Sequence, residues 1–122
     1  MAIIDQNVLN NFFLEICGGD RDLLEELATD CSQDARQLAA TIKTSLSAND
    51  LEPLRRSAHS LKSTSATFGA MALSDSARSL ESLTQDEASL DANRSKVESL
   101  AKEIETGTEE FAQTLEKIGE LV

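Results

Sequence analysis

The strongest constraint on the fold is a set of apolar stripes at helical spacing along almost the whole chain. In the last thirty residues the stripes form two seams with a seven-residue repeat, Val97, Ile104, Phe111 and Ile118 in one and Leu100, Thr108, Leu115 and Val122 in the other. No segment is rich in the β-branched and aromatic residues that favour strands, and Trp and Tyr are absent. The pattern therefore predicts an all-α protein.

Residues that start or stop helices divide these stripes into five segments. The expected helices run from Asp5 to Cys17, from a cap at Asp20 to about Leu46, from a cap at Asn49 or Asp50 to Gly69, from there to Leu83 or Thr84, and from Ala92 to Leu121. The polar stretch 85–91 is expected to be a turn. Short connections favour antiparallel packing. We therefore expect one domain, residues 1–122, folded as an antiparallel up-down four-helix bundle with an additional short N-terminal helix.

Charge and composition narrow the class of function. Twenty-two acidic residues against eleven Lys and Arg give a net charge of −11, which disfavours nucleic acid and anionic membranes as partners. No apolar run is long enough to span a bilayer and no secretory signal is recognisable, so a cytoplasmic protein is expected. Cys17 and Cys31 fall on apolar stripes without CxxC spacing, which favours buried free thiols over a disulfide or a reactive thiol.

The one histidine of the chain, His59, is expected to face solvent. With about 100° of rotation per helical residue, the apolar residues of segment 51–68 cluster on one side, and His59 lies about 140° from Leu54, which marks that side. Segment 53–74 contains no acidic residue, whereas about four would be expected from the average composition. This window contains Arg55, Arg56 and Lys62, so it predicts a local site for an anion.

Small residues surround the histidine and leave room for a partner to reach it: Ala58, Ser60, Ser63, Thr64 and Ala66. A surface histidine is often inert, however, and a basic window is often only the solvated face of a helix. A metal site is disfavoured because the chain has no second histidine and no pair of cysteines at the spacing of metal ligands. No nucleophile-elbow or nucleotide-binding glycine pattern is present. The run Ser63-Thr64-Ser65 fits packing spacers better than a phosphorylation site.

The segment around the histidine resembles the signature of the histidine-containing phosphotransfer (HPt) domain family. Residues 58–70 read AHSLKSTSATFGA, which is similar to the family pattern AHxLK, small residues, and a glycine ten positions after the histidine. Three further matches follow the family's order and spacing: Gly18-Gly19-Asp20 with Leu23-Leu24, then Asn49-Asp50, then Leu80-Glu81. The resemblance thus covers nearly the whole chain.

The resemblance implies a role for each matching residue. His59 would accept a phosphoryl group, through Nε2, and Lys62 would contact the phosphoryl oxygens, while Gly69 would serve the tight turn after the helix. Ser63 departs from the glycine of many members, and its small side chain still allows close approach and a hydrogen bond to the phosphoryl group. Partner contacts are expected at Arg55, Arg56, Ser63, Ala66 and Gly69.

The resemblance also implies the partners. A response-regulator receiver domain and a sensor histidine kinase are expected, with Mg²⁺ bound by the receiver and no cofactor in this chain. The chain would be a monomeric carrier without kinase or ATPase activity, and Met1 so close to the first helix favours a stand-alone protein. Two alternatives remain. A kinase dimerisation and phosphoacceptor fragment usually has an acid after its histidine, where Ser60 stands here, and a helical adaptor would need no phosphate chemistry.

Overall fold

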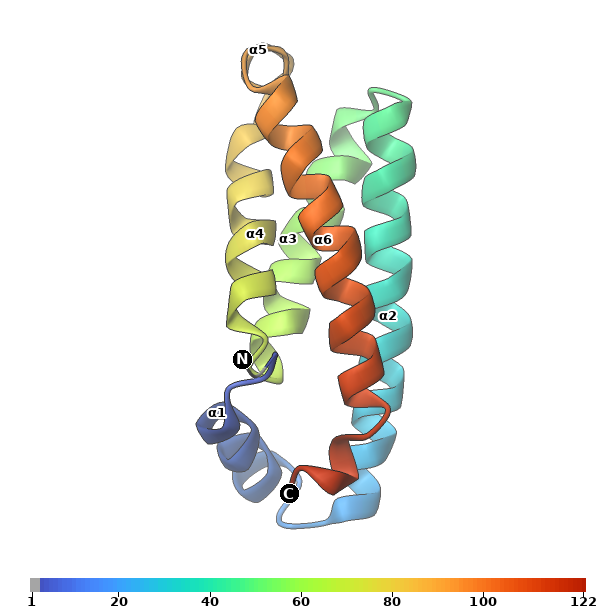
Figure 1. Cartoon of the computed structure of the whole chain (residues 1–122), viewed down its shortest axis with the longest axis vertical. Helices are drawn as coiled ribbons and strands as arrows, with labels where there is room; N and C mark the ends of the chain where they lie inside the picture. Colours follow the sequence, from blue (N-terminus) through green and yellow to red (C-terminus); the bar gives the residue numbers. More distant parts are fainter. Residues whose placement is uncertain (1–2) are drawn as a thin grey trace.

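Four long helices form the body of the molecule (Figure 1). The structure is a computed structural model that describes residues 3–122. The long helices are α2 (Arg21–Ser47), α3 (Leu51–Thr67), α4 (Met71–Leu83) and α6 (Arg94–Leu115). Each packs against the next, and α6 packs against both α2 and α4, so α3 and α6 lie diagonally opposite. The predicted all-α antiparallel bundle is confirmed, and none of the described residues forms a strand.

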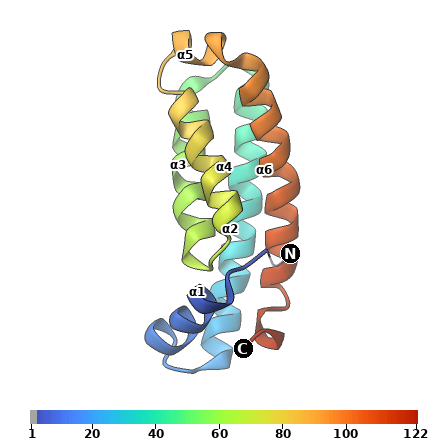
Figure 2. The same ribbon diagram turned by 60° about the vertical axis from the view of Figure 1, so that its left-hand side comes forward.

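A short N-terminal arm crosses one end of the bundle, below α3 and α4 in Figure 2. Its first part is α1 (Gln6–Asn11), which continues into the π-helical turn η1 (Phe12–Ile16). The arm confirms the predicted first helix. In a regular α-helix Ile16 would share the inner face of half-buried Phe12, but Ile16 is 64% exposed. The wider π-turn changes the angular spacing of side chains from that of an α-helix, so the apolar stripe loses its register there.

Two boundaries near the C-terminus also differ from the prediction. The expected turn at 85–91 contains a short helix, α5 (Glu87–Ala92), because Asp86 accepts a hydrogen bond from the Ser89 N–H at 2.7 Å and Leu90 is buried. The last long helix ends at Leu115 instead of Leu121, and the short 3₁₀ helix η2 (Ile118–Glu120) follows it. Ile118 is nevertheless buried, because the chain turns back against the bundle.

The two predicted helix caps at Asp20 and Asp50 differ in what their side chains do. Asp20 caps α2 as expected, and its side chain accepts a hydrogen bond from the Leu23 N–H at 3.2 Å. Asp50 occupies the corresponding position before α3, but its side chain makes no capping hydrogen bond. Asn49 adopts a left-handed conformation with φ 53° and accepts a hydrogen bond from the Arg94 side chain at 2.6 Å. It therefore links the end of α2 to the start of α6.

The core contains most of the side chains that the apolar stripes predicted, although Leu100 and Val122 of the second seam are only half-buried. Val97, Ile104, Phe111 and Ile118 of the seven-residue repeat are all buried, as is Thr108. Cys17 and Cys31 are buried free cysteines, which confirms the prediction for both. Burial raises the pKa of Cys31 to about 12 and that of Cys17 above its ordinary value, so both thiols are protonated at neutral pH.

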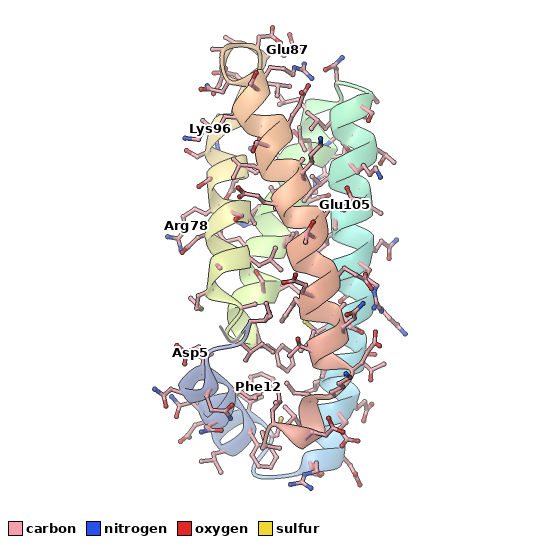
Figure 3. All side chains as sticks on the ribbon, in the orientation of Figure 1. Asp5, Phe12, Arg78, Glu87, Lys96 and Glu105 are labelled. Carbon is pink, nitrogen blue, oxygen red and sulfur yellow. The ribbon has the colours of Figure 1, made fainter. Side chains whose placement is uncertain are left out.

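The N-terminal arm is fastened to the turn between α3 and α4. The Asp5 N–H donates a hydrogen bond to the Gly69 carbonyl at 2.8 Å, and the rings of Phe12 and Phe68 lie 4.7 Å apart. Asp5 and Phe12 mark the two ends of this contact region in Figure 3. Gly69 has φ 86°, and a Cβ placed there would lie 3.0 Å from both the Asp5 carbonyl oxygen and Val8 Cβ. Both the backbone conformation and the close approach therefore require glycine.

Gly69→Ala is expected to lower the free energy of unfolding by about 2–4 kcal/mol, because it adds left-handed strain and forces the arm away from the turn. Chemical denaturation followed by circular dichroism measures the change. Gly19→Ala is the matched control, since Gly19 has φ 76° but open space around its Cβ position, and it is expected to cost only about 1 kcal/mol. Equal costs at the two positions would contradict the contact with the arm.

Candidate functional site

His59 stands on the outer face of α3, at the middle of that helix. Its side chain is 61% exposed, whereas Leu54, Ala58 and Leu61 on the same helix are fully buried. The exposure expected from helical periodicity is therefore confirmed. A helix that is packed on both sides by α2 and α4 gives the imidazole a rigid base.

A single carboxylate joins the histidine and the lysine of the predicted site. Glu81, from α4, places Oε2 at 2.6 Å from His59 Nδ1, and its Oε1 accepts a hydrogen bond from Lys62 Nζ at 2.9 Å. The Glu81 side chain is only 20% exposed and that of Lys62 27% exposed, so water competes little for either contact. The three side chains thus form one fixed group at the junction of α3 and α4.

This contact determines which ring nitrogen of His59 faces a hydrogen-bond acceptor. The hydrogen bond from Lys62 is the main cause that holds the pKa of Glu81 below its ordinary value, desolvation opposes it, and the hydrogen bond from His59 adds to the lowering. Glu81 is therefore a carboxylate at neutral pH, and a carboxylate only accepts hydrogen bonds. Nδ1 must then carry the proton, so that in the neutral imidazole the Nε2 lone pair is free.

Small polar residues bring α4 close enough for Glu81 to reach the histidine. Ser65 and Ser74 are both buried where α3 meets α4. Ser74 Oγ donates to the Lys62 carbonyl at 2.8 Å, and Ser65 Oγ donates to the Leu61 carbonyl at 2.6 Å. Satisfied hydroxyls of this size allow close helix packing without an unpaired polar group. The hydrogen bond from Ser74 crosses from α4 to α3, and Ser74 lies two turns before Glu81 on the same face of α4.

The positive charge around the histidine is smaller than the sequence window indicated. The guanidinium groups of Arg55 and Arg56 both pair with Glu52, at 2.8 and 3.0 Å. Glu52 lies immediately before the acid-free window, and Glu81 enters the same surface from α4. The acid-free segment of the sequence is therefore not an acid-free surface. Arg55 and Arg56 share Glu52, and Lys62 pairs with Glu81.

The remaining predicted site residues lie at different depths along α3. Ser63 is exposed one turn beyond His59, and Ala66 is half-buried almost two turns beyond it. Gly69 is buried in the turn beneath the N-terminal arm, so the structure gives it a place in the backbone and not on the outer face. Partner contact by these residues and by Arg55 and Arg56 stays a prediction.

Glu81 is the residue whose role the sequence reasoning missed. In the sequence, Leu80-Glu81 matches the family pattern, but the resemblance implies no function for the carboxylate. A signal was present, because Glu81 lies one helical turn after buried Ala77 and directly after buried Leu80, at the edge of the apolar stripe of α4. An acid in that position faces a neighbouring helix, where a cation or an imidazole is its expected partner.

Other kinds of site find little support among the described residues. Within 3–122, no three His, Cys, Asp or Glu side chains gather in an arrangement suited to a metal ion. In the same range, no helix is both long enough and apolar enough to cross a membrane.

The fold and the site define a helical bundle that presents one imidazole to solvent, oriented by a carboxylate and flanked by a lysine. The Hpt domain family model matches residues 26–114, which is more than half of the chain, and the chain belongs to this family. Hpt domains transfer phosphoryl groups through a histidine in phosphorelays. No curated protein and no solved structure gives a significant match to the chain.

Glu81→Gln is expected to lower the free energy of unfolding by about 1 kcal/mol at pH 7. The amide replaces the carboxylate, so the hydrogen bond from Lys62 loses its charged acceptor. The pKa of Glu81 is lowered in the folded state, so its contribution is complete above the ordinary glutamate pKa of about 4.3. It is lost as the pH falls through the lowered folded value. Urea denaturation of the variant and the wild type between pH 7 and pH 3 measures this loss.

The matched control is Glu103→Gln, which changes an exposed carboxylate on α6, the helix diagonal to α3. This substitution is expected to change the unfolding free energy by less than about 0.5 kcal/mol. A difference between wild type and Glu81→Gln that stays constant down to pH 3 would show that the carboxylate charge is not the cause.

Proposed function

We propose that this chain is a phosphorelay intermediate. It accepts a phosphoryl group on His59 from an aspartyl phosphate of a receiver domain, or from a kinase, and passes it to the aspartate of a response-regulator receiver. The observation that carries the proposal is the contact between His59 Nδ1 and Glu81, which leaves Nε2 as the exposed nucleophile. Membership of the Hpt family supports the same chemistry.

The proposed transfer is a displacement at phosphorus. The Nε2 lone pair of His59 attacks, the Nε2–P bond forms, and the bond between phosphorus and the aspartyl oxygen breaks, so the aspartate leaves as a carboxylate. The proton on Nδ1 stays in place, and the ring becomes a positively charged phosphoimidazole. Onward transfer to another receiver reverses these steps. Such transfers depend mainly on in-line positioning and on charge stabilisation.

Each neighbour of the histidine has a part in this scheme. Glu81 holds the Nδ1 proton and stabilises the positive charge that the ring gains when the Nε2–P bond forms. Lys62, one turn from His59, supplies positive charge to the phosphoryl oxygens and remains anchored by Glu81. Glu81 is thus a positioning residue as well as an electrostatic partner, and it couples the imidazole to the lysine.

The receiver would supply what this chain is proposed to lack. The acidic receiver pocket binds Mg²⁺ and holds the reacting aspartate, while this chain contributes the imidazole and Lys62. The contact would be transient and small, because a relay carrier must release each partner after transfer. We propose that the chain acts as a monomer and as a carrier, with no ATP-dependent step of its own.

His59→Gln is expected to abolish phosphoryl uptake and to leave the helical fold intact, because the side chain is exposed and packs little. Incubation with candidate phosphorylated receivers, followed by gel detection of the label, measures uptake, and the label on the wild type should be lost in acid. Circular dichroism checks the fold. Lys96→Gln, on α6 (Figure 3), is the control and should be labelled normally. Full labelling of His59→Gln would refute the assignment to this histidine, whereas a wild type that no phosphorylated receiver labels would favour a helical adaptor.

Glu81→Ala is expected to slow transfer from the receiver by about tenfold, because the imidazole loses the acceptor that holds its proton on Nδ1. Nitrogen-15 NMR of His59 measures the two tautomers directly, and the Nε2–H form should increase in the variant. Glu81→Gln should restore part of the transfer rate and part of the Nδ1–H tautomer, since its amide oxygen can still accept a hydrogen bond from Nδ1. A slower rate with unchanged tautomers would point to lost packing instead of lost orientation.

A further inference from the structure

The two sides of the histidine are not equivalent. Viewed along α3 from His59, Lys62 lies about 60° to one side and Ser63 about 40° to the other. The side of Lys62 faces α4, where Glu81 holds it. The opposite side faces α2, because Ser60 and Thr64, further round in the direction of Ser63, line a groove between α2 and α3. Glu81 and Lys62 therefore occupy the α4 side of the imidazole, and Ser63 flanks it on the α2 side.

Ser63 carries a hydroxyl that the fold does not use. Ser65 and Thr67 on the same helix donate their hydroxyl hydrogens to the carbonyls of Leu61 and Ser63, one turn back. Within residues 3–122, the Ser63 hydroxyl has no such partner, and the side chain is exposed. Residues four apart on a helix have Cβ atoms about 5–6 Å apart, so this hydroxyl is near enough to reach a group bound to the His59 ring.

We propose that Ser63 is a phosphoryl-binding residue, whose hydroxyl donates a hydrogen bond to the phosphoryl group on His59 from the side opposite Lys62. This inference rests on the proposed function, and it assigns a ligand contact to the position where many family members have glycine. The bound phosphoryl group then lies between an ammonium donor on the α4 side and a hydroxyl donor on the α2 side.

The charges at the site explain why a second donor matters. Lys62, one turn after His59 on α3, is already shared with Glu81. Arg55 and Arg56 are paired with Glu52. A phosphoryl dianion has three acceptor oxygens, and one shared ammonium cannot satisfy all of them. The Ser63 hydroxyl adds a donor without breaking any ion pair, and it favours the dianion over the monoanion.

The test uses the whole chain loaded with phosphate from phosphoramidate, so that no partner protein is needed. In this reaction His59 Nε2 forms a bond to phosphorus, the P–N bond of phosphoramidate breaks, and ammonia leaves with the electron pair of that bond. The chain has one histidine, so phosphorus-31 NMR follows a single phosphohistidine. A pH titration of its signal measures the second pKa of the phosphoryl group.

Ser63→Ala is expected to raise that phosphoryl pKa by about 0.5, because the dianion loses a donor. Ser63→Thr keeps the hydroxyl and should stay near the wild-type value, while Ser63→Gly should behave like Ser63→Ala. Thr67→Ala is the matched control, because its hydroxyl is already engaged with the Ser63 carbonyl. An unchanged phosphoryl pKa in both Ser63→Ala and Ser63→Gly, or an equal change in Thr67→Ala, would overturn the proposal.

The same samples separate this inference from the proposed function. If receivers exchange phosphate with the wild type but Ser63→Ala leaves the phosphoryl pKa unchanged, only the Ser63 contact is wrong. If the Ser63 effect is present but no phosphorylated receiver labels the wild type, the contact stands and the relay role fails.

Discussion

The site depends on one carboxylate that two helices share. Glu81 reaches from α4 to α3 and contacts His59 with one oxygen and Lys62 with the other. This single contact decides which ring nitrogen carries the proton, where the lysine is held, and which side of the imidazole stays open. It is also only partly exposed, so its geometry persists in water better than that of a surface ion pair. The packing of α3 against α4 therefore holds Glu81 beside His59 and Lys62.

Most of the fold followed from the periodicity of apolar residues. The seven-residue repeat through Val97, Ile104 and Phe111 predicted both the last long helix and its buried face. Predictions failed where a few polar residues or a changed helical pitch decided the outcome. The short helix α5 depends on one cap at Asp86, and the π-turn η1 moves Ile16 out to solvent. Neither effect changes the amino-acid composition of the surrounding segment, so patterns of composition and apolar spacing do not predict it.

The site was predictable in part, and the division has a physical cause. The exposure of His59 and the closeness of Lys62 are properties of a single helix, which sequence spacing determines. The role of Glu81 depends on how α4 is rotated relative to α3, and the hydroxyl of buried Ser74 bonds across that interface to the Lys62 carbonyl. The pairing of Arg55 and Arg56 with the single carboxylate of Glu52 likewise depends on side-chain geometry. An absence of acids along the sequence was therefore a poor measure of the charge at the surface.

The arm that covers Gly69 changes where this domain physically begins. The family match starts at residue 26, inside α2, yet Asp5 and Val8 of the arm pack against the turn that follows the histidine helix. A recombinant fragment cut to the boundaries of the match would lose the first turn of α2 and the whole arm. It would keep His59, Lys62 and Glu81, but Phe68 would lose its contact with Phe12 of the arm. Fragments meant to report on native transfer should therefore start before the arm.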